Sequence, residues 1–224
     1  MDLKNKVVLI TGSSIGIGRE TAFKFAKEGC RVIVTYYKDK KEGQETADKC
    51  LKLGASDVLL LHLNVMDNIS IRNCVKNVVQ KFREIDILIN NAGIVVWKNL
   101  EEQSFEDIEN EVRTNLEGLI KMTRECLPYI KETIINISSG AGKDAFAGLS
   151  TYCATKFGIR GFTQAMDNEL SGIRVFSVNP GSTATRMTNF QGTKPERVAD
   201  VVLRAAKNEA KPDSRRDVDV WNFA

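Results

Sequence analysis

The hydrophobic positions of this chain form short apolar runs separated by longer amphipathic stretches. Runs rich in Val, Ile and Leu are typical of parallel strands that are covered on both faces. They predict six buried strands, over residues 7–11, 31–36, 58–63, 85–89, 133–137 and 175–178. The stretches between them are long enough for crossover helices, which we expect over residues 16–28, 41–53, 68–83, 104–127 and 151–170.

Alternating strands and helices predict the fold class. Such a chain forms an α/β, doubly wound (Rossmann) parallel sheet with helices on both faces. We expect a single domain over residues 1–224, with a short C-terminal substrate segment at about 182–224. The helix at 104–127 has the clearest bounds, because Ser104 and Asp107 resemble a capping box and Pro128 follows the apolar pattern. Residues 218–220 are a candidate for a last edge strand.

Composition excludes several function classes. The net charge is only +3 and is spread along the chain, so we expect no nucleic-acid partner. The five cysteines form an odd set without a C-x-x-C pair, which argues against a disulfide framework and against a metal site. No secretory leader precedes the first strand and no apolar stretch reaches 18 residues, so we expect a cytoplasmic protein without a membrane span.

A glycine-rich segment carries the first chemical signal. Gly12, Gly16 and Gly18 lie directly after the first strand and open the first helix. Glycines allow a tight turn and the close approach of a dinucleotide, and the helix N-terminus offers free N–H groups to its diphosphate. The alternative is a glycine turn that only joins strand to helix, but the strand-turn-helix context favours cofactor binding.

A tyrosine and a lysine carry the second signal. Tyr152 and Lys156 are four residues apart, which places phenol and ammonium on one helical face. A pair of this kind can also be an ordinary surface pair. Ser138 and Ser139 end the fifth strand, however, and doubly wound sheets bind ligands at the ends of their parallel strands. We therefore expect these groups to converge on one crevice.

With these motifs, the chain resembles the short-chain dehydrogenase/reductase family, in particular its 3-oxoacyl-ACP reductase-like and carbonyl reductase-like members. The resemblance covers residues 5–190, and its motifs stand in the family's order. They are Thr11-Gly12-x3-Gly16-Ile17-Gly18, Asn90-Asn91-Ala92-Gly93, Asn115, Ser139, Tyr152-x3-Lys156 and Pro180-Gly181.

The resemblance implies four catalytic residues. Tyr152 would be the general acid/base, and Lys156 would lower its pKa from about 10 and hold the nicotinamide ribose. Ser139 would hydrogen-bond the substrate oxygen, and Asn115 would hold a water that links Lys156 to solvent. The alternatives are a solvated helix lysine for Lys156 and a solvent-facing polar residue for Asn115.

The expected cofactor is NADP(H) rather than NAD(H). NAD-using members have an acid at the end of the second strand, whereas this chain has Tyr37 and Lys38, which suit a 2′-phosphate. Ile15 argues against NADP, since NADP-using relatives often have a basic residue there. The expected cofactor-binding residues are Gly12, Ser14, Ile15, Gly16, Ile17, Gly18, Tyr37, Lys38, Asn64, Val65, Asn91, Ala92, Gly93, Tyr152, Lys156, Pro180, Gly181, Thr183 and Thr185.

These features predict an NADP-preferring oxidoreductase that transfers a hydride between nicotinamide and a small-molecule carbonyl or alcohol. The alternative is a catalytically weak NADP-binding sensor or scaffold of the same fold. The short segment at 182–194 predicts a small lid and an open mouth, and we expect a homodimer or a homotetramer. The residues expected around the substrate are apolar: Val95, Val96, Trp97, Phe146, Leu149, Met187 and Phe190.

Overall fold

A seven-stranded parallel sheet forms the centre of the molecule in the computed structural model, which describes residues 2–223. Its strands lie in the order β3-β2-β1-β4-β5-β6-β7. Their bounds are β1 Val7–Ile10, β2 Arg31–Tyr36, β3 Asp57–His62, β4 Ile85–Asn90, β5 Ile130–Ile137, β6 Arg174–Asn179 and β7 Asp217–Asp219. The strand order reverses its direction between β1 and β4, which is where a doubly wound sheet opens a ligand crevice.

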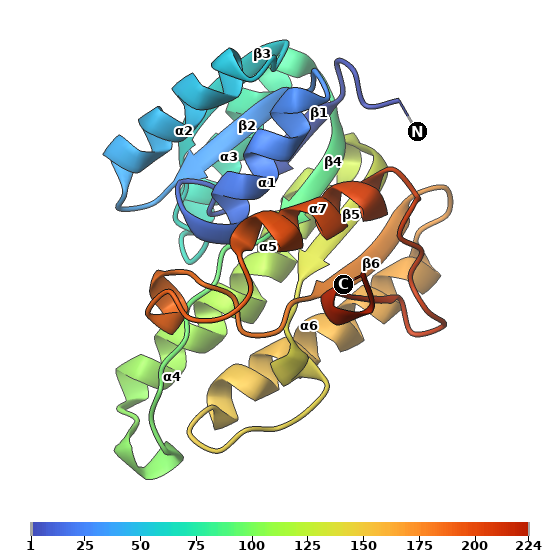
Figure 1. The fold of residues 1–224 in the computed structure, drawn as a ribbon. Helices are drawn as coiled ribbons and strands as arrows, with labels where there is room; N and C mark the ends of the chain where they lie inside the picture. The colour runs from blue at the N-terminus through green and yellow to red at the C-terminus, as the bar shows by residue number, and fades with distance from the viewer. Residues whose placement is uncertain (1, 224) are drawn as a thin grey trace.

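Helices cover both faces of the sheet, as Figure 1 shows. The bounds of the helices are α1 Gly16–Lys27, α2 Lys40–Lys52, α3 Asn68–Phe82, α4 Phe105–Val112, α5 Gly118–Cys126, α6 Ser150–Glu169 and α7 Pro195–Ala206. One apolar core joins α1, α2 and α7 to one face, and a second joins α3, α5 and α6 to the other. The predicted fold class is therefore confirmed.

Strand β3 differs from the sequence expectation. We expected a buried strand there, but the side chains of Asp57–His62 are only half-buried or exposed. The reason is its place at the edge of the sheet, where it pairs with β2 alone. His62 ends this strand, and its exposed ring lies 5.6 Å from the ring of Tyr36.

The expected helix at 104–127 is also different. Its start is as expected, because the Asp107 N–H donates to Ser104 Oγ at 3.0 Å. A π-helical turn, Arg113–Glu117, then separates α4 from α5. Such turns insert one extra residue and occur frequently at functional sites. Asn115 lies in the middle of this turn.

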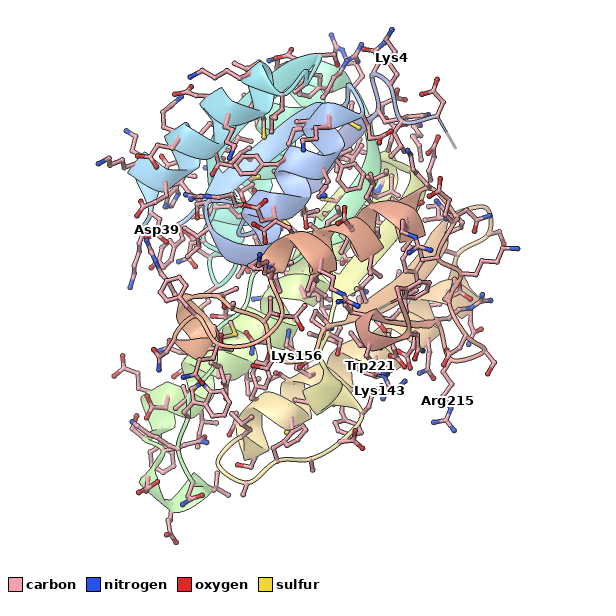
Figure 2. The ribbon with its side chains drawn as sticks, viewed as in Figure 1. Lys4, Asp39, Lys143, Lys156, Arg215 and Trp221 are labelled. Carbon is pink, nitrogen blue, oxygen red and sulfur yellow. The ribbon has the colours of Figure 1, made fainter. Side chains whose placement is uncertain are left out.

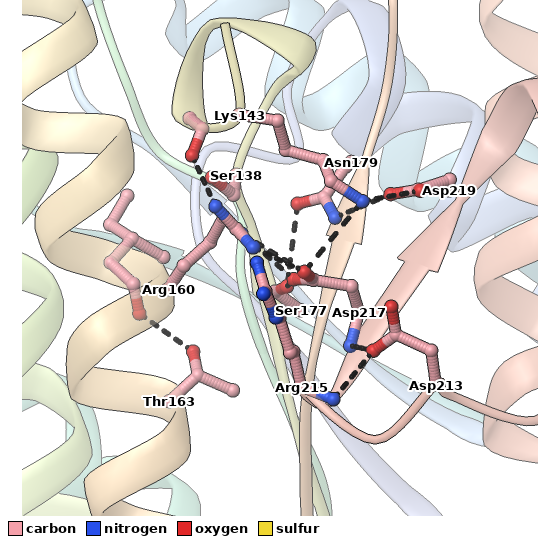
Figure 3. Close-up of polar contacts among 12 residues, drawn as sticks. Ser138, Lys143, Arg160, Thr163, Ser177, Asn179, Asp213, Arg215, Asp217 and Asp219 are labelled. Carbon is pink, nitrogen blue, oxygen red and sulfur yellow. Dashed lines mark hydrogen bonds and ion pairs between the residues drawn. The ribbon is translucent and has the colours of Figure 1, made fainter.

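The C-terminal strand is fixed by a buried polar network, drawn in Figure 3. β7 Asp217–Asp219 forms the edge beside β6, close to the expected 218–220. The Arg160 guanidinium on α6 contacts Asp217 at 2.5 Å, and Ser177 Oγ donates to the same carboxylate at 2.6 Å. Arg160 also donates to the carbonyl of Gly142, which follows β5. The network therefore ties β7 to the loop that begins at Ser139.

Candidate active site

A cavity of about 1070 Å³ opens at the carboxyl ends of the strands. Figure 2 labels two of its lining residues, Asp39 beside the end of β2 and Lys156 on α6. Every residue that we expected to bind the cofactor or to act in catalysis lines it, except Gly18 and Asn115. The structure therefore gathers residues from position 12 to position 185 around one space.

The glycine loop has the shape that a close-lying ligand requires. Gly12 and Gly16 have φ values of 64° and 59°, which disfavour any side chain. A Cβ on Gly18 would lie 2.4 Å from the Gly12 carbonyl oxygen, so Gly18 serves close packing of the loop rather than the cavity wall. No acidic residue lies in the first turn of α1, and Ile15 provides no side-chain cap. The first N–H groups of α1 are thus suited to an anion.

Asn91 holds this loop against the end of β4. Its side-chain amide donates to the carbonyls of Thr11 and Gly12 at 2.9 and 3.0 Å. Asn90 instead braces the strands, as expected, because it donates to Thr123 Oγ1 and Asn136 Oδ1, both at 2.9 Å. The two neighbouring amides therefore have separate structural tasks.

Tyr152, Ser139 and Lys156 meet at the other end of the cavity. A hydrogen bond joins the Tyr152 and Ser139 side chains. The Lys156 ammonium is buried, donates to the Ile137 carbonyl at 3.0 Å and lies 5.4 Å from the centre of the Tyr152 ring. Lys156 is therefore not a solvated helix lysine.

Burial controls the protonation of both groups. It raises the pKa of Tyr152 to about 12, against the opposing effect of the Ser139 hydrogen bond. It lowers the pKa of Lys156 to about 8, and the charge of Glu111 opposes this change. Desolvation is the larger effect here, so the expected lowering of the Tyr152 pKa by Lys156 stays a prediction. Near neutral pH the phenol is protonated and the ammonium is charged.

Asn115 and Glu111 lie behind the cavity and hold its wall. Asn115 is fully buried, so it does not face solvent. Its Oδ1 accepts from the Ile94 N–H at 2.8 Å and its Nδ2 donates to the Ile94 carbonyl at 2.9 Å. Glu111 Oε1 accepts from the Val96 N–H at 2.8 Å. We did not predict Glu111, although its spacing of four residues from Asn115 could have indicated it.

A cluster of charges lies at the end of β2. Tyr37 is 45% exposed, and the Lys38 ammonium lies 5.3 Å from the centre of its ring. Arg186 reaches this cluster from the far side of the cavity and pairs with Asp39 and Glu42, both at 2.9 Å. Sequence reasoning missed Arg186, because its partners lie 147 and 144 residues earlier.

The segment at 182–194 spans the cavity despite its shortness. Arg186 fixes it to one wall, and the Met187 carbonyl accepts from Trp97 Nε1 at 3.2 Å on another. Among the expected apolar substrate residues, Val96 and Phe190 do not line the cavity, and Phe190 is 70% exposed. The mouth is thus bridged on this side, in contrast to the open mouth that we expected.

The described residues fit an extended dinucleotide. The free N–H groups of α1 suit its diphosphate, and a Cβ on Gly16 would fill space only 3.3 Å from Thr185 Cγ2. Between residues 2 and 223 there is no group of three His, Cys, Asp or Glu side chains placed to hold a metal ion. In the same part of the chain, no helix is long and apolar enough to cross a membrane.

Comparisons with known proteins agree with this geometry. Residues 6–196 match the family model described as short chain dehydrogenase. The chain is 36% identical to the 3-oxoacyl-[acyl-carrier-protein] reductase of Thermotoga maritima, over 94% of each chain. It is 33% identical to the NADP-dependent 3-hydroxy acid dehydrogenase of Schizosaccharomyces pombe, over 91% of this chain and 87% of that one.

A solved structure gives the same result. The short chain dehydrogenase from Burkholderia cenocepacia in complex with NADP superimposes with a TM-score of 0.90 at 28% identity, over 98% of this chain and 97% of the other. The chain therefore belongs to the short chain dehydrogenase family of oxidoreductases.

Proposed function

We propose that this protein reduces a carbonyl compound to an alcohol with NADPH, and that Tyr152 is its proton donor. The observation that carries the proposal is the meeting of Tyr152, Ser139 and Lys156 in the cavity that the glycine loop also lines. A phenol that stays protonated near neutral pH is suited to give a proton to a carbonyl oxygen.

Each residue has a proposed task. NADPH would supply the hydride when it is bound. Tyr152 donates a proton to the substrate oxygen, and the Ser139 hydroxyl donates a hydrogen bond to the same oxygen as negative charge develops there. Lys156, which donates to the Ile137 carbonyl in this structure, would hold the ribose hydroxyls of the cofactor, and its charge stabilises the Tyr152 phenolate after proton transfer. Asn115 keeps the wall at Ile94 in place.

The end of β2 supports NADP over NAD. Tyr37 and Lys38 line the cavity where an acid would repel a 2′-phosphate. Arg186 neutralises the nearby acids Asp39 and Glu42, which further favours an anionic ligand there. The name of the Schizosaccharomyces pombe relative and the NADP complex of the Burkholderia cenocepacia protein support the same choice.

The cavity wall supports apolar carbonyl substrates. Val95, Trp97, Phe146, Leu149 and Met187 line it, so a charged substrate would lose hydration without compensation. The names of two relatives make 3-oxoacyl and 3-hydroxy compounds a second group to test.

One assay tests the activity. Ketones, diketones, quinones and 3-oxoacyl thioesters are offered with NADPH and with NADH, and the loss of cofactor absorbance is followed. We expect turnover of apolar carbonyls with NADPH. NADPH binding without turnover of any compound would instead support the sensor or scaffold alternative.

We also propose that residues 1–224 form a single catalytic domain and that the protein works as a cytoplasmic homodimer or homotetramer. All five cysteines are free, which suits a reducing compartment. Val112 on α4, Ile120 on α5 and Phe157 on α6 are at least 37% exposed, which is consistent with contacts between copies. Light scattering during size-exclusion chromatography tests the assembly, and a monomeric mass would contradict it.

A further inference from the structure

Glu111 is a buried acid whose presence the proposed reaction does not explain. It lies in α4 with 0% of its surface exposed. Oε1 accepts from the Val96 N–H at 2.8 Å, but within residues 2–223 its Oε2 has no hydrogen-bond partner. Buried polar groups are nearly always paired, because an unpaired one loses its hydration without compensation. A side chain of this kind needs a specific reason at this position.

Charges of the proposed catalytic residues act on Glu111 from the neighbouring helix. α4 packs against α6, and from α6 the ammonium of Lys156 and the phenol of Tyr152 interact electrostatically with the Glu111 carboxylate. On its own helix, the Asp107 carboxylate accepts from Lys98 and from the Ser104 N–H, at 2.7 and 3.0 Å, and its charge raises the pKa of Glu111. Burial, the largest effect, raises the pKa of Glu111, and the Lys156 charge opposes this change. A Cβ on Gly93 would lie 3.2 Å from Asn115 Oδ1 and 3.8 Å from Lys156 Nζ, so the ammonium lies close to Asn115, four residues after Glu111. The ionised form of Glu111 therefore provides a negative charge near the buried Lys156.

Glu111 also holds the cavity wall together with Asn115. Asn115 binds both backbone polar groups of Ile94, and Glu111 binds the N–H of Val96, two residues further on. Val95 lies between these two anchors, and Trp97 follows them. Both line the cavity, so the Glu111 hydrogen bond fixes part of the proposed substrate wall.

We propose that Glu111 is a positioning residue with two separable tasks: its oxygen holds the 94–97 loop through Val96, and its charge is the counter-charge that keeps Lys156 protonated. The inference rests on the proposed function for the role of Lys156 in turnover. The physical coupling of Glu111 to Lys156 can be measured without turnover.

Glu111→Gln separates the two tasks, because glutamine keeps an acceptor oxygen for Val96 but carries no charge. Lysine labelled with ¹³C at Cε reports the Lys156 pKa by NMR, and Lys156→Met assigns the signal. We expect the Lys156 pKa to fall by roughly one unit in Glu111→Gln, a tenfold loss of proton affinity. Glu109→Gln is the matched control, since Glu109 is exposed on the same helix.

Kinetics then test both tasks in the enzyme. The high-pH limb of kcat should move to lower pH in Glu111→Gln, while the KM for a ketone at the optimum stays within about twofold of wild type. Glu111→Leu, checked for folding by circular dichroism and NADPH binding, should also raise KM, by roughly tenfold.

The outcomes are distinct. An unchanged Lys156 signal in Glu111→Gln would overturn the counter-charge, whether or not the wild type turns over a carbonyl. Two results would overturn the role of Glu111 in holding the 94–97 loop. One is a KM as high in Glu111→Gln as in Glu111→Leu, and the other is an unchanged KM in a folded Glu111→Leu. Absence of wild-type turnover alone would overturn the proposed function, and the NMR result would still decide the counter-charge.

Discussion

At the residue scale, burial gives the site its chemistry. Tyr152 and Lys156 are four residues apart, and this spacing predicted their meeting with Ser139. The spacing did not predict the protonation of the pair. Desolvation disfavours the charged form of each group, so it raises the pKa of the phenol and lowers that of the ammonium. Such effects depend on the surrounding volume, which a motif does not specify.

Replacing Tyr152 tests the proposed proton donor. Tyr152→Phe should lower kcat by roughly 10²- to 10⁴-fold, because the phenyl ring keeps the packing but cannot give a proton. The dissociation constant of NADPH should change little, as measured by fluorescence titration. Tyr129→Phe, which is remote from the cavity, is the control. A Tyr152→Phe enzyme that keeps most of its rate when chemistry limits turnover would refute the mechanism.

The Lys156 pKa predicts how the rate depends on pH. Its charged form is present below about pH 8 and is lost as the pH rises through that value. We therefore expect kcat/KM for carbonyl reduction to be level near neutral pH and to fall tenfold per pH unit well above 8. The profile is measured with a slow, apolar ketone. A rate that stays level to about pH 10 would show that the Lys156 charge is not needed.

Lys38 tests the choice of cofactor. Lys38→Ala should weaken NADPH binding by about 1–3 kcal/mol, if its ammonium contacts the 2′-phosphate directly. NADH binding should be nearly unchanged, because that cofactor lacks this phosphate. Calorimetric titration measures both affinities. Equal losses for the two cofactors would remove Lys38 from phosphate recognition.

At the element scale, the sequence predicted the helices and strands themselves better than it predicted which elements lie beside one another. The apolar run at 58–63 correctly indicated a strand, but hydrophobic periodicity contains no information on strand order, so the edge position of β3 was missed. The π-helical turn at Arg113–Glu117 was also missed, because its pattern is that of an ordinary amphipathic helix. The contacts of Arg186 depend on tertiary packing alone.

The segment at 182–194 provides a prediction of its own. The ion pairs of Arg186 are exposed, and solvent screens such pairs strongly, so they can open and close readily. Arg186→Gln should therefore speed NADPH release by up to roughly tenfold, as stopped-flow fluorescence would show, without unfolding the protein. Lys194→Gln, at the other end of the segment, is the control. An unchanged release rate would mean that the pairs do not retain the cofactor.

At the scale of the whole molecule, the last strand depends on one buried ion pair. Burial, the largest effect, would raise the pKa of Asp217, but the hydrogen bonds from Arg160, Ser177 and Asn179 outweigh it and lower the pKa. Asp217 therefore stabilises the fold above its unfolded pKa of about 4, and this stability is lost as the pH falls below that range.

Removing this carboxylate tests the network. Asp217→Ala leaves the Arg160 charge buried and unpaired, and should lower the free energy of unfolding by about 3–5 kcal/mol. Asp57→Ala breaks the exposed pair with Lys81 and should cost at most about 1 kcal/mol. Urea unfolding followed by circular dichroism measures both. Similar losses in the two variants would show that burial adds nothing to the Asp217 pair.

The attachment of the C-terminal residues also bears on the synthesis of the protein. The loop after Ser139 is held by residues that the ribosome adds after the first six strands: Lys143 pairs with Asp219, and the Trp221 ring lies against Gly140. A growing chain that has passed residue 210 already contains six of the seven strands, but it lacks these anchors. The first six strands can therefore form on the ribosome before the loop at Ser139 is fixed, and the geometry of the candidate site is completed only after residues 217–221 have left the exit tunnel.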